Sequence, residues 1–518
     1  MRLYGLTSQG LWYDEACSIF LSDYAAHWNE LFNVDYNNDP PLFLLILLGW
    51  RHLLSFMRDV FSTDWFLRFL PCFFSVLTVP AVYGATKALF TYRPSAEEPS
   101  AVSPSIENTA LCASFLMALS PFHRFYAQEL RGYSLLTLLA VLVLWAFIQA
   151  LQHNRIRHWL LLSLLLSLSF WTHFFAAWFF MVLNLYLLLT FPIHKKRYLP
   201  WAISHIIAGL LCLPALYYAW QVSRIVNAFS VQWIPAPDLK TLFITYKTFF
   251  AGYSPRALFY WPLFLLAGLL TISGLWSLRR HCHFFLLLFL WTGCAMAISA
   301  IIWYYRDFSY YEHRLFVWSS FSAAIIVARG WAVLKPRLQQ LSGIVFILLS
   351  LPLLYDSTVH AVHPVPQHRL GVRYKADSRG AASCLAREAF AGEAVYHASH
   401  VTLPPLRFYL PAHPQIHLCR TPEELEGFYS AYPNEALWAH LNFQPYLWSE
   451  LTEKPATFWW VRSWWEPFDI PDQVFELEKE ISAAYEPTAE RVFFGITLIR
   501  FERKPSAPSE QMSDEPWP

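Results

Sequence analysis

The feature that most constrains the fold of this chain is a series of apolar stretches, each about as long as a membrane-spanning helix. A helix needs roughly 20 mainly apolar residues to cross the hydrocarbon core of a bilayer. We expect such helices at residues 65–90, 107–125, 132–151, 158–172, 174–191, 200–220, 257–278, 284–304, 314–334 and 338–356. Of the 518 residues, 56% are hydrophobic and only 14% are charged, which excludes an ordinary soluble enzyme. The chain is predicted to be a polytopic α-helical membrane protein.

The stretch 40–57 is also apolar, and the basic loops decide whether it crosses the membrane. If it is a re-entrant or juxtamembrane helix, the basic loops all fall on one side, which the positive-inside rule makes the cytoplasm. These basic positions are 152–158, 194–197, 279–283 and 335–337, with Lys87 and Arg93. Asp14 then lies outside, which calls for a preceding helix, and residues 1–10 are too short and too polar to form one. We expect a truncated chain or a misassigned start codon, or else an N-terminus that begins outside.

Beyond residue 356 the composition changes to that of a small extramembrane domain. We expect a transmembrane module at 1–356 with an external loop at 11–64, a linker at 357–370, an external α/β domain at 371–503 and a disordered tail at 504–518. Helical patterns at 380–389, 422–431 and 474–485 alternate with β-type runs at 393–397, 415–419, 457–461 and 491–501, which predicts a mostly parallel or mixed sheet.

Two smaller features of this domain each leave two interpretations open. The aromatic run FWWVRSWWEPF at 458–468 is either a carbohydrate or lipid contact, or a buried strand with a packing loop. Cys384 and Cys419 could form a disulfide if the domain faces an oxidising compartment. We expect the domain to help bind an acceptor or to gate a cavity.

Two adjacent carboxylates, Asp14 and Glu15, stand out in the apolar run LWYDEACSIF. Asp14 is either the N-cap of the following helix or a functional carboxylate at the membrane surface. Partial desolvation would raise its pKa and make it a better base toward an acceptor hydroxyl or amine. Glu15 could bind a divalent cation or orient Asp14.

Basic residues at the starts of helices gather on the same outer face. Arg131 and Arg314 each open an apolar helix, in AQELRGYSLL and YYEHRLF, and His173 lies at the same depth. An arginine at this depth has two interpretations. Its side chain either extends to the lipid headgroups, in which case Arg131 could pair with Glu129, or its guanidinium group binds a phosphate through two hydrogen bonds. The shared face favours a phosphate or diphosphate leaving group, because ionisable groups near hydrocarbon usually mark a functional site.

Asp39 and Arg68 belong to the same outer region. Asp39 precedes Pro40 and Pro41 and is either the cap of the next helix or a ligand. Arg68 lies just inside a predicted span and needs a partner, for which Asp39 or Asp14 would serve. A simple salt bridge in the core is the alternative.

Several motifs in a fixed order resemble a known superfamily. They are RLYGLTSQGLWYDEACS, NDPPLFLLILLGW, DWFLRFLPCFFSVLTVPAVYG, LSPFHRFYAQELRGYSLLTLLAVL, WTHFFAAW and YYEHRLFVWSS. Over residues 2–335 the chain resembles the GT-C membrane glycosyltransferases that use polyprenyl-phosphate sugars, akin to protein mannosyltransferases and lipid A aminoarabinose transferases. The string SRGAASCLA…EAVYHASHVTLPPLRFYL is similar to the soluble domain of many bacterial members. Many members have His where this chain has Asp39.

The resemblance implies roles for the residues selected above. Asp14 matches the catalytic acid of the first external loop, with Glu15 and Asp39 orienting the acceptor or a metal. The donor phosphate would be bound by Arg131, Tyr133, Arg314 and His173, supported by Arg68, Glu129 and His313. No cofactor is certain, and a divalent cation, Mg²⁺ or Mn²⁺, is an open alternative with Glu15 as its candidate ligand.

The implied reaction is the inverting transfer of a sugar from a polyprenyl-phosphate donor to a lipid, polysaccharide or protein acceptor. We expect an integral protein of the bacterial inner membrane, in contact with the lipid bilayer, whose active site and C-terminal domain face the periplasmic side. No Gly-rich nucleotide fingerprint is present among the 17 glycines, and no nucleic-acid partner is expected. The alternative function is a transporter or flippase, but the charges lie near one face rather than at the bilayer midplane.

Overall fold

The structure of the protein, a computed structural model, describes residues 2–24, 31–34, 39–53, 64–93, 104–225, 236–279, 282–306, 309–370, 372, 374–431, 435–451, 454–463 and 471–505. The chain divides into two compact units. The helical unit comprises Met1–Leu6 and Asp39–Val372, and the α/β unit comprises Thr7–Asn38 and Arg373–Pro518. The expected linker 357–370 belongs to the helical unit, and residues 7–38, which include part of the expected external loop 11–64, belong to the α/β unit. Most of the expected tail, residues 506–518, lies outside the described residues.

Seven helices in the described part of the helical unit are long and apolar enough to cross a membrane, which confirms the polytopic prediction. The long helices are α4 (Asp64–Thr91), α7 (Tyr133–His153), α11 (Tyr198–Ile225), α13 (Ala257–Leu278), α14 (Cys282–Arg306), α15 (Ser320–Ala332) with the preceding 3₁₀ turn η6 (His313–Ser319), and α16 (Pro336–Thr358). Short helices complete the unit: α2 (Leu42–Leu53), α5 (Pro104–Leu119), α6 (Pro121–Ala127), α8 (Ile156–Thr172), η3 (Phe174–Ala176), α9 (Ala177–Leu189), α10 (Phe191–His194), η4 (Lys195–Arg197), α12 (Leu239–Ala251) and η7 (Pro366–Arg369).

The helix α2 covers residues 42–53 of the ambiguous apolar stretch 40–57, and these 12 residues rise about 18 Å. Residues 54–57 lie outside the described residues, so the interpretation that the stretch does not span the membrane stays a prediction. The predicted span 107–125 is interrupted at Ser120, whose hydroxyl accepts a hydrogen bond from the amide of His123 and caps the new helix α6. Pro121 at the first position of α6 fits this break, because proline cannot continue a helix hydrogen-bond ladder.

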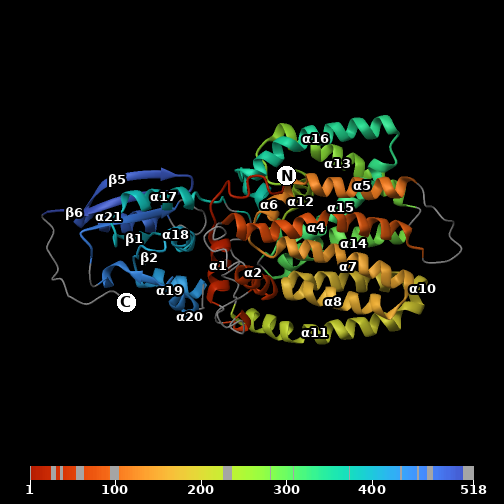
Figure 1. Ribbon diagram of the computed structural model, residues 1–518, viewed down its shortest axis with the longest axis horizontal. Helices are drawn as coiled ribbons and strands as arrows, with labels where there is room; N and C mark the ends of the chain where they lie inside the picture. The colour runs from red at the N-terminus through yellow and green to blue at the C-terminus, as the bar shows by residue number, and fades with distance from the viewer. Residues whose placement is uncertain are drawn as a thin grey trace. The chain divides into compact units, whose positions relative to one another are not determined.

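The long helices of the helical unit lie side by side, with α6 and α12 at one end and α10 at the other (Figure 1). The helices α13 and α15 touch backbone to backbone where two glycines meet. A Cβ built on Gly330 would lie 1.8 Å from the carbonyl oxygen of Leu270, and one on Gly274 would lie 2.1 Å from that of Ile326. Small residues allow this close approach, which is how helices associate in lipid without a hydrophobic driving force.

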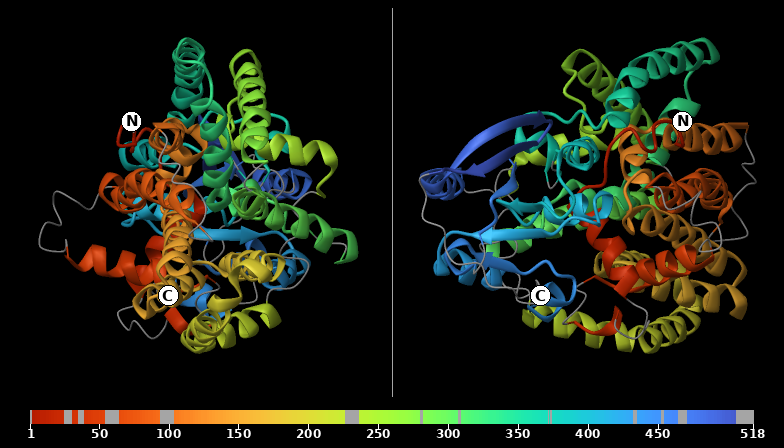
Figure 2. Two further views of the ribbon diagram at one scale, coloured as in Figure 1. Left: turned by 90° about the vertical axis from the view of Figure 1, so that its right-hand side faces the viewer. Right: turned by 60° about the vertical axis from the view of Figure 1, so that its left-hand side comes forward.

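The α/β unit is built on a six-stranded mixed sheet with the strand order β3-β2-β1-β4-β6-β5 (Figure 1, Figure 2). The strands are β1 (Ala394–His397), β2 (Gln415–Cys419), β3 (Pro445–Leu447), β4 (Thr457–Ser463), β5 (Tyr485–Phe493) and β6 (Ile496–Arg503). The pairs β1–β2, β1–β4 and β2–β3 are parallel, whereas β4–β6 and β5–β6 are antiparallel. The expected single run at 491–501 is two strands, because Gly495, with φ of 77°, turns the chain between them.

Helices cover both faces of the sheet. The helices of the unit are α1 (Tyr13–Tyr24), α17 (Ser378–Glu388), α18 (Leu403–Tyr409), α19 (Pro422–Ala431), α20 (Glu435–His440), η8 (Trp448–Glu450) and α21 (Pro471–Ala484). Residues of α17 and α18 pack on one face with Trp459, and residues of α21 pack on the other with Trp460. The residues Phe458 to Val461 are all 0% exposed, so the carbohydrate-contact interpretation is wrong for this part of the aromatic run and the buried-strand interpretation holds. Residues 464–468 lie outside the described residues.

The possible disulfide of this unit is not formed. Cys384 and Cys419 are both free and buried. Cys384 Sγ instead contacts the carboxylate of Glu388 one turn further along α17, at 3.4 Å.

Candidate functional site

The two acids at the start of α1 take different positions in the α/β unit. Glu15 is 0% exposed, and its Oε2 accepts hydrogen bonds from the amide of Trp12 at 3.3 Å and from Nζ of Lys375 at 3.4 Å. A glutamate at the third helical position that reaches back to the residue before the helix is half of a capping box. Glu15 therefore closes the N-terminus of α1 and forms a buried ion pair.

Asp14 is partly exposed, and it lies inside the first turn because α1 begins one residue earlier, at Tyr13. The N-cap interpretation of Asp14 is therefore wrong. Its backbone carbonyl accepts a hydrogen bond from the hydroxyl of Ser18 at 2.8 Å, as expected for a helical residue. Of the two acids, Asp14 is partly exposed, whereas Glu15 is fully buried in its ion pair.

Arg131 and Asp39 form an ion pair in the helical unit. Nη2 of Arg131 lies 2.9 Å from Oδ2 of Asp39, and the two side chains are 20% and 44% exposed. Arg131 comes from the turn between α6 and α7, and Asp39 from the residues that precede α2. From the sequence, Arg131 was expected to pair with Glu129 or to bind a phosphate. In the structure Asp39 orients Arg131, and Glu129 is buried.

His173 lies at the end of α8, beside this ion pair. Its Nδ1 accepts a hydrogen bond from the amide of Phe175 at 3.1 Å, so the neutral ring carries its proton on Nε2. Burial lowers the pKa of His173 to about 4, with Arg131 and Arg314 lowering it further against the opposing charge of Asp39. The imidazole is therefore a neutral donor at pH 7, within electrostatic reach of two guanidinium groups and one carboxylate.

Arg314, near the start of η6, is paired with Glu312 from the same segment. Its Nη2 donates to Oε1 of Glu312 at 3.3 Å, and its Nε contacts the other carboxylate oxygen. Both side chains are largely buried, at 15% and 2% exposed. The neighbouring His313 is 0% exposed and stacks on Tyr253, with 6.0 Å between ring centroids, so it packs in the core.

Tyr133 and Arg68 are two further predicted site residues of the helical unit, and both are buried. Tyr133 is buried, and its ring lies 6.0 Å from the ring of His173. Arg68 in α4 is 1% exposed, and its Nη1 donates to the carbonyl of Leu6 at 3.2 Å. Of the two partners expected for Arg68, Asp39 is paired with Arg131, and the pairing with Asp14 stays a prediction.

The structure thus describes two groups of predicted site residues. Arg131, Asp39, His173 and Arg314 gather in the helical unit, brought together from the turn before α7, the residues before α2, the end of α8 and the start of η6. Asp14 and Glu15 belong to the α/β unit. The first group combines two oriented guanidinium groups with a neutral imidazole donor, which is a donor set suited to a phosphate group.

Comparisons with known proteins show what the chain is similar to. The family described as dolichyl-phosphate-mannose-protein mannosyltransferase matches residues 104–218, which include Arg131 and His173. No curated protein matches the chain by sequence. The crystal structure of ArnT from Cupriavidus metallidurans in the apo state is similar with a TM-score of 0.63 and 12% identity, over 96% of this chain and 95% of that chain. The structure of the same protein bound to undecaprenyl phosphate is similar with a TM-score of 0.60 and 13% identity, over 98% and 97%.

The chain has the GT-C fold. The similarity extends over nearly the full length of both chains, so it includes the α/β unit as well as the helices. The GT-C resemblance found in the sequence motifs is thereby confirmed at the level of the fold.

Within this GT-C fold the structure also shows buried polar residues that the sequence analysis did not select. Lys247 in α12 is 1% exposed, and its Nζ donates to the carbonyl of Gly252 at 3.2 Å and lies 4.7 Å from the centre of the Tyr260 ring. Burial lowers the pKa of Lys247 to about 7. A single lysine in the aromatic run TYKTFF was the available signal.

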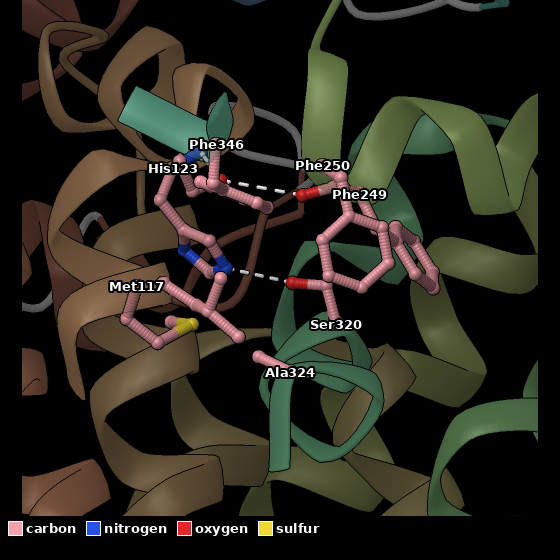
Figure 3. A pocket seen from close by; sticks show the side chains of 9 residues that line it. Met117, His123, Phe249, Phe250, Ser320, Ala324 and Phe346 are labelled. Atoms are coloured by element: carbon pink, nitrogen blue, oxygen red, sulfur yellow. Dashed lines mark hydrogen bonds between the residues drawn. The ribbon is translucent and has the colours of Figure 1, made fainter. Parts of the chain in front are cut away.

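A small cavity in the helical unit lies between α5, α6, α12, α15 and α16 (Figure 3). In it, Nε2 of His123 lies 2.7 Å from the hydroxyl of Ser320, and the hydroxyl of Ser120 donates to the carbonyl of Phe249 at 3.3 Å. None of the predicted site residues lines this cavity. These polar side chains have hydrogen-bond partners within the helical unit, so the cavity belongs to the core of this unit.

In the described residues no group of three or more His, Cys, Asp and Glu side chains is placed to hold a metal ion. Glu15, the candidate ligand, does not suit a divalent cation, because its buried carboxylate already accepts from an ammonium group and a backbone amide.

Proposed function

We propose that this protein transfers a sugar from a polyprenyl-phosphate carrier to an acceptor on the non-cytoplasmic side of the membrane, with inversion at the anomeric carbon. The observation that carries the proposal is the convergence of Arg131, Arg314 and His173 at one end of the helices. The ArnT structure with undecaprenyl phosphate supports a polyprenyl-phosphate ligand for this fold.

In this proposal the two arginines and the histidine bind the phosphate of the carrier. Arg131 and Arg314 are already oriented by Asp39 and Glu312, so little reorganisation is needed when negative charge develops on the departing phosphate. The neutral His173 would donate its Nε2 proton to a third phosphate oxygen. Such preorganised donors stabilise the transition state more than the substrate, which is the requirement for catalysis.

Asp14 is the proposed general base. An oxygen or nitrogen of the acceptor attacks the anomeric carbon, and its proton passes to the carboxylate of Asp14. The bond between the anomeric carbon and the phosphate oxygen breaks, and the polyprenyl phosphate leaves with the bonding electrons. A single displacement of this kind inverts the configuration. Glu15 keeps its structural role, and no step passes through a metal.

To test the proposal, the full-length protein in lipid nanodiscs is incubated with each of a panel of radiolabelled polyprenyl-phosphate hexoses and pentoses. The product that acquires the label is then identified. Asp14→Asn should abolish transfer and leave binding of undecaprenyl phosphate intact, because the phosphate residues belong to the helical unit. Glu486→Gln, an exposed acid on β5, is the matched control and should transfer normally. Near-normal turnover by Asp14→Asn would refute the assignment of the base.

A further inference from the structure

The helix that carries Asp14 is folded as part of the α/β unit, although 349 residues lie between Tyr24 and Tyr374 in the sequence. Tyr13 packs edge-on against His400 with 5.4 Å between ring centroids, and Phe20 packs edge-on against Phe443 at 5.1 Å. Both rings join a hydrophobic cluster around α18, α19 and α20. One face of α1 is therefore buried in the domain formed by the end of the chain.

The residues just before α1 are held by Arg379, which lies in the first turn of α17. Its Nη1 donates to the carbonyl of Thr7 at 2.7 Å, and its Nη2 donates to the carbonyl of Gln9 at 3.1 Å. The amide of Leu11 donates to the hydroxyl of Tyr409 at 2.8 Å. A Cβ on Gly10 would lie 3.1 Å from the amide nitrogen of Arg379, so the segment passes close against α17. A planar guanidinium that spans two carbonyls fixes both position and direction of the segment.

The first turn of α1 is held by Lys375. Its Nζ lies 3.4 Å from Oε2 of Glu15 and 5.8 Å from the centre of the Trp12 ring. Lys375 is 4% exposed and Glu15 is 0% exposed, so the ion pair is shielded from water. Charges buried in this way interact strongly, and removing one partner leaves the other uncompensated. Because Glu15 is adjacent to Asp14, the pair fixes the rotation of the turn from which Asp14 projects.

We propose that Lys375 and Arg379 are positioning residues for the transfer reaction, so that the α/β unit holds the carboxylate of Asp14 in its catalytic orientation. This inference rests on the proposed function, and it assigns to the α/β unit a part in positioning the base, beside the acceptor binding or gating expected from sequence. Each residue of a helix is turned by 100° from the last, so a small change in the start of α1 redirects Asp14. A misplacement of about 1 Å of a catalytic group can lower the rate about 100-fold.

The first test replaces Lys375 with methionine, which keeps the length of the side chain and removes its charge. We expect kcat to fall by about 10- to 100-fold with an unchanged KM for the donor. The double variant Glu15→Gln with Lys375→Met leaves no buried charge unpaired, but it still lacks the ion pair that fixes the turn, so we expect kcat to recover only in part. Lys479→Met, at an exposed position of α21, is the matched control and should have no effect.

The second test measures the position of α1 without relying on activity. Hydrogen–deuterium exchange of the full-length protein in nanodiscs should show faster exchange at Tyr13–Tyr24 in Lys375→Met and a smaller increase in the double variant, with α7 unchanged in both. Wild-type exchange at α1 in Lys375→Met would overturn the proposal, as would a donor KM that rises together with the fall in kcat. If the wild-type protein transfers no sugar, the proposed function fails, and the exchange data still decide whether Lys375 positions α1.

Discussion

Three buried histidines should make the stability of the α/β unit depend strongly on pH. His397 at the end of β1, His400 beyond it and His417 in β2 are at most 9% exposed. Burial lowers the pKa of His397 and of His400 to about 3, with His417 adding to both effects, and burial lowers the pKa of His417 to about 4. Two further groups act on His397: Gln415 raises its pKa by a hydrogen bond and the charge of Arg407 lowers it.

The sign of the pH dependence follows from which state, unfolded or folded, binds protons at the higher pH. The unfolded chain takes up protons on these histidines below about pH 6.5, whereas the folded unit resists them until about pH 4 or below. Stability is therefore fully present above pH 6.5 and is lost as the pH falls from there toward 4. At pH 5.0 the loss is about 2 kcal/mol for each histidine and about 6 kcal/mol for the three together. This is comparable with the whole free energy of unfolding of a typical domain, about 5–15 kcal/mol.

The assay is hydrogen–deuterium exchange of the full-length protein in nanodiscs at pH 7.5 and 5.0, corrected for the intrinsic rate at each pH. We expect protection in β1, β2 and α18 to fall at pH 5.0, while protection in α7 of the helical unit stays the same. The ring of Tyr13, the residue before Asp14, packs against His400. The rate of the sugar transfer proposed for Asp14 should therefore fall over the same pH range. His417→Gln should remove about a third of the pH dependence. Equal protection of β1 and β2 at the two pH values would refute the reasoning.

Two further predictions concern the helical unit. Arg131→Ala should weaken binding of undecaprenyl phosphate about 10- to 100-fold, because a charge-assisted hydrogen bond contributes about 1.5–3 kcal/mol. Arg155→Ala, at an exposed position of the same unit, is the control and should not weaken it, and an equal loss in both variants by titration calorimetry would indicate damage to the fold instead. Gly330→Ala should lower the thermal unfolding temperature in detergent, because its Cβ would overlap the carbonyl of Leu270 and overpacking costs about 1–3 kcal/mol. Gly268→Ala, with no atom within 4 Å of the new Cβ, is the control, and equal stability of the two variants would contradict the close contact of α13 and α15.

Much of the fold was predictable because its determinants are local in the sequence. The expected span 65–90 became α4 (Asp64–Thr91), and the expected span 257–278 became α13 with the same bounds. Length and hydropathy suffice there, because a helix in lipid satisfies its backbone within its own segment. The strands β1 and β2 were also expected within one residue, since β-type runs bounded by turns are local patterns. The extra strand β3 was missed because three residues carry too little pattern.

The sequence by itself determined which side chains would be exceptional, and the tertiary structure decided which of them meet. The pair Asp14 and Glu15 was selected from composition, but only the fold assigned Glu15 to Lys375, a residue 360 positions away. Only the fold paired Asp39 with Arg131, and only the fold placed α1 in the α/β unit. The physical reason is that an ion pair or a packed face depends on distance in space, and no local pattern records which distant segment supplies the partner.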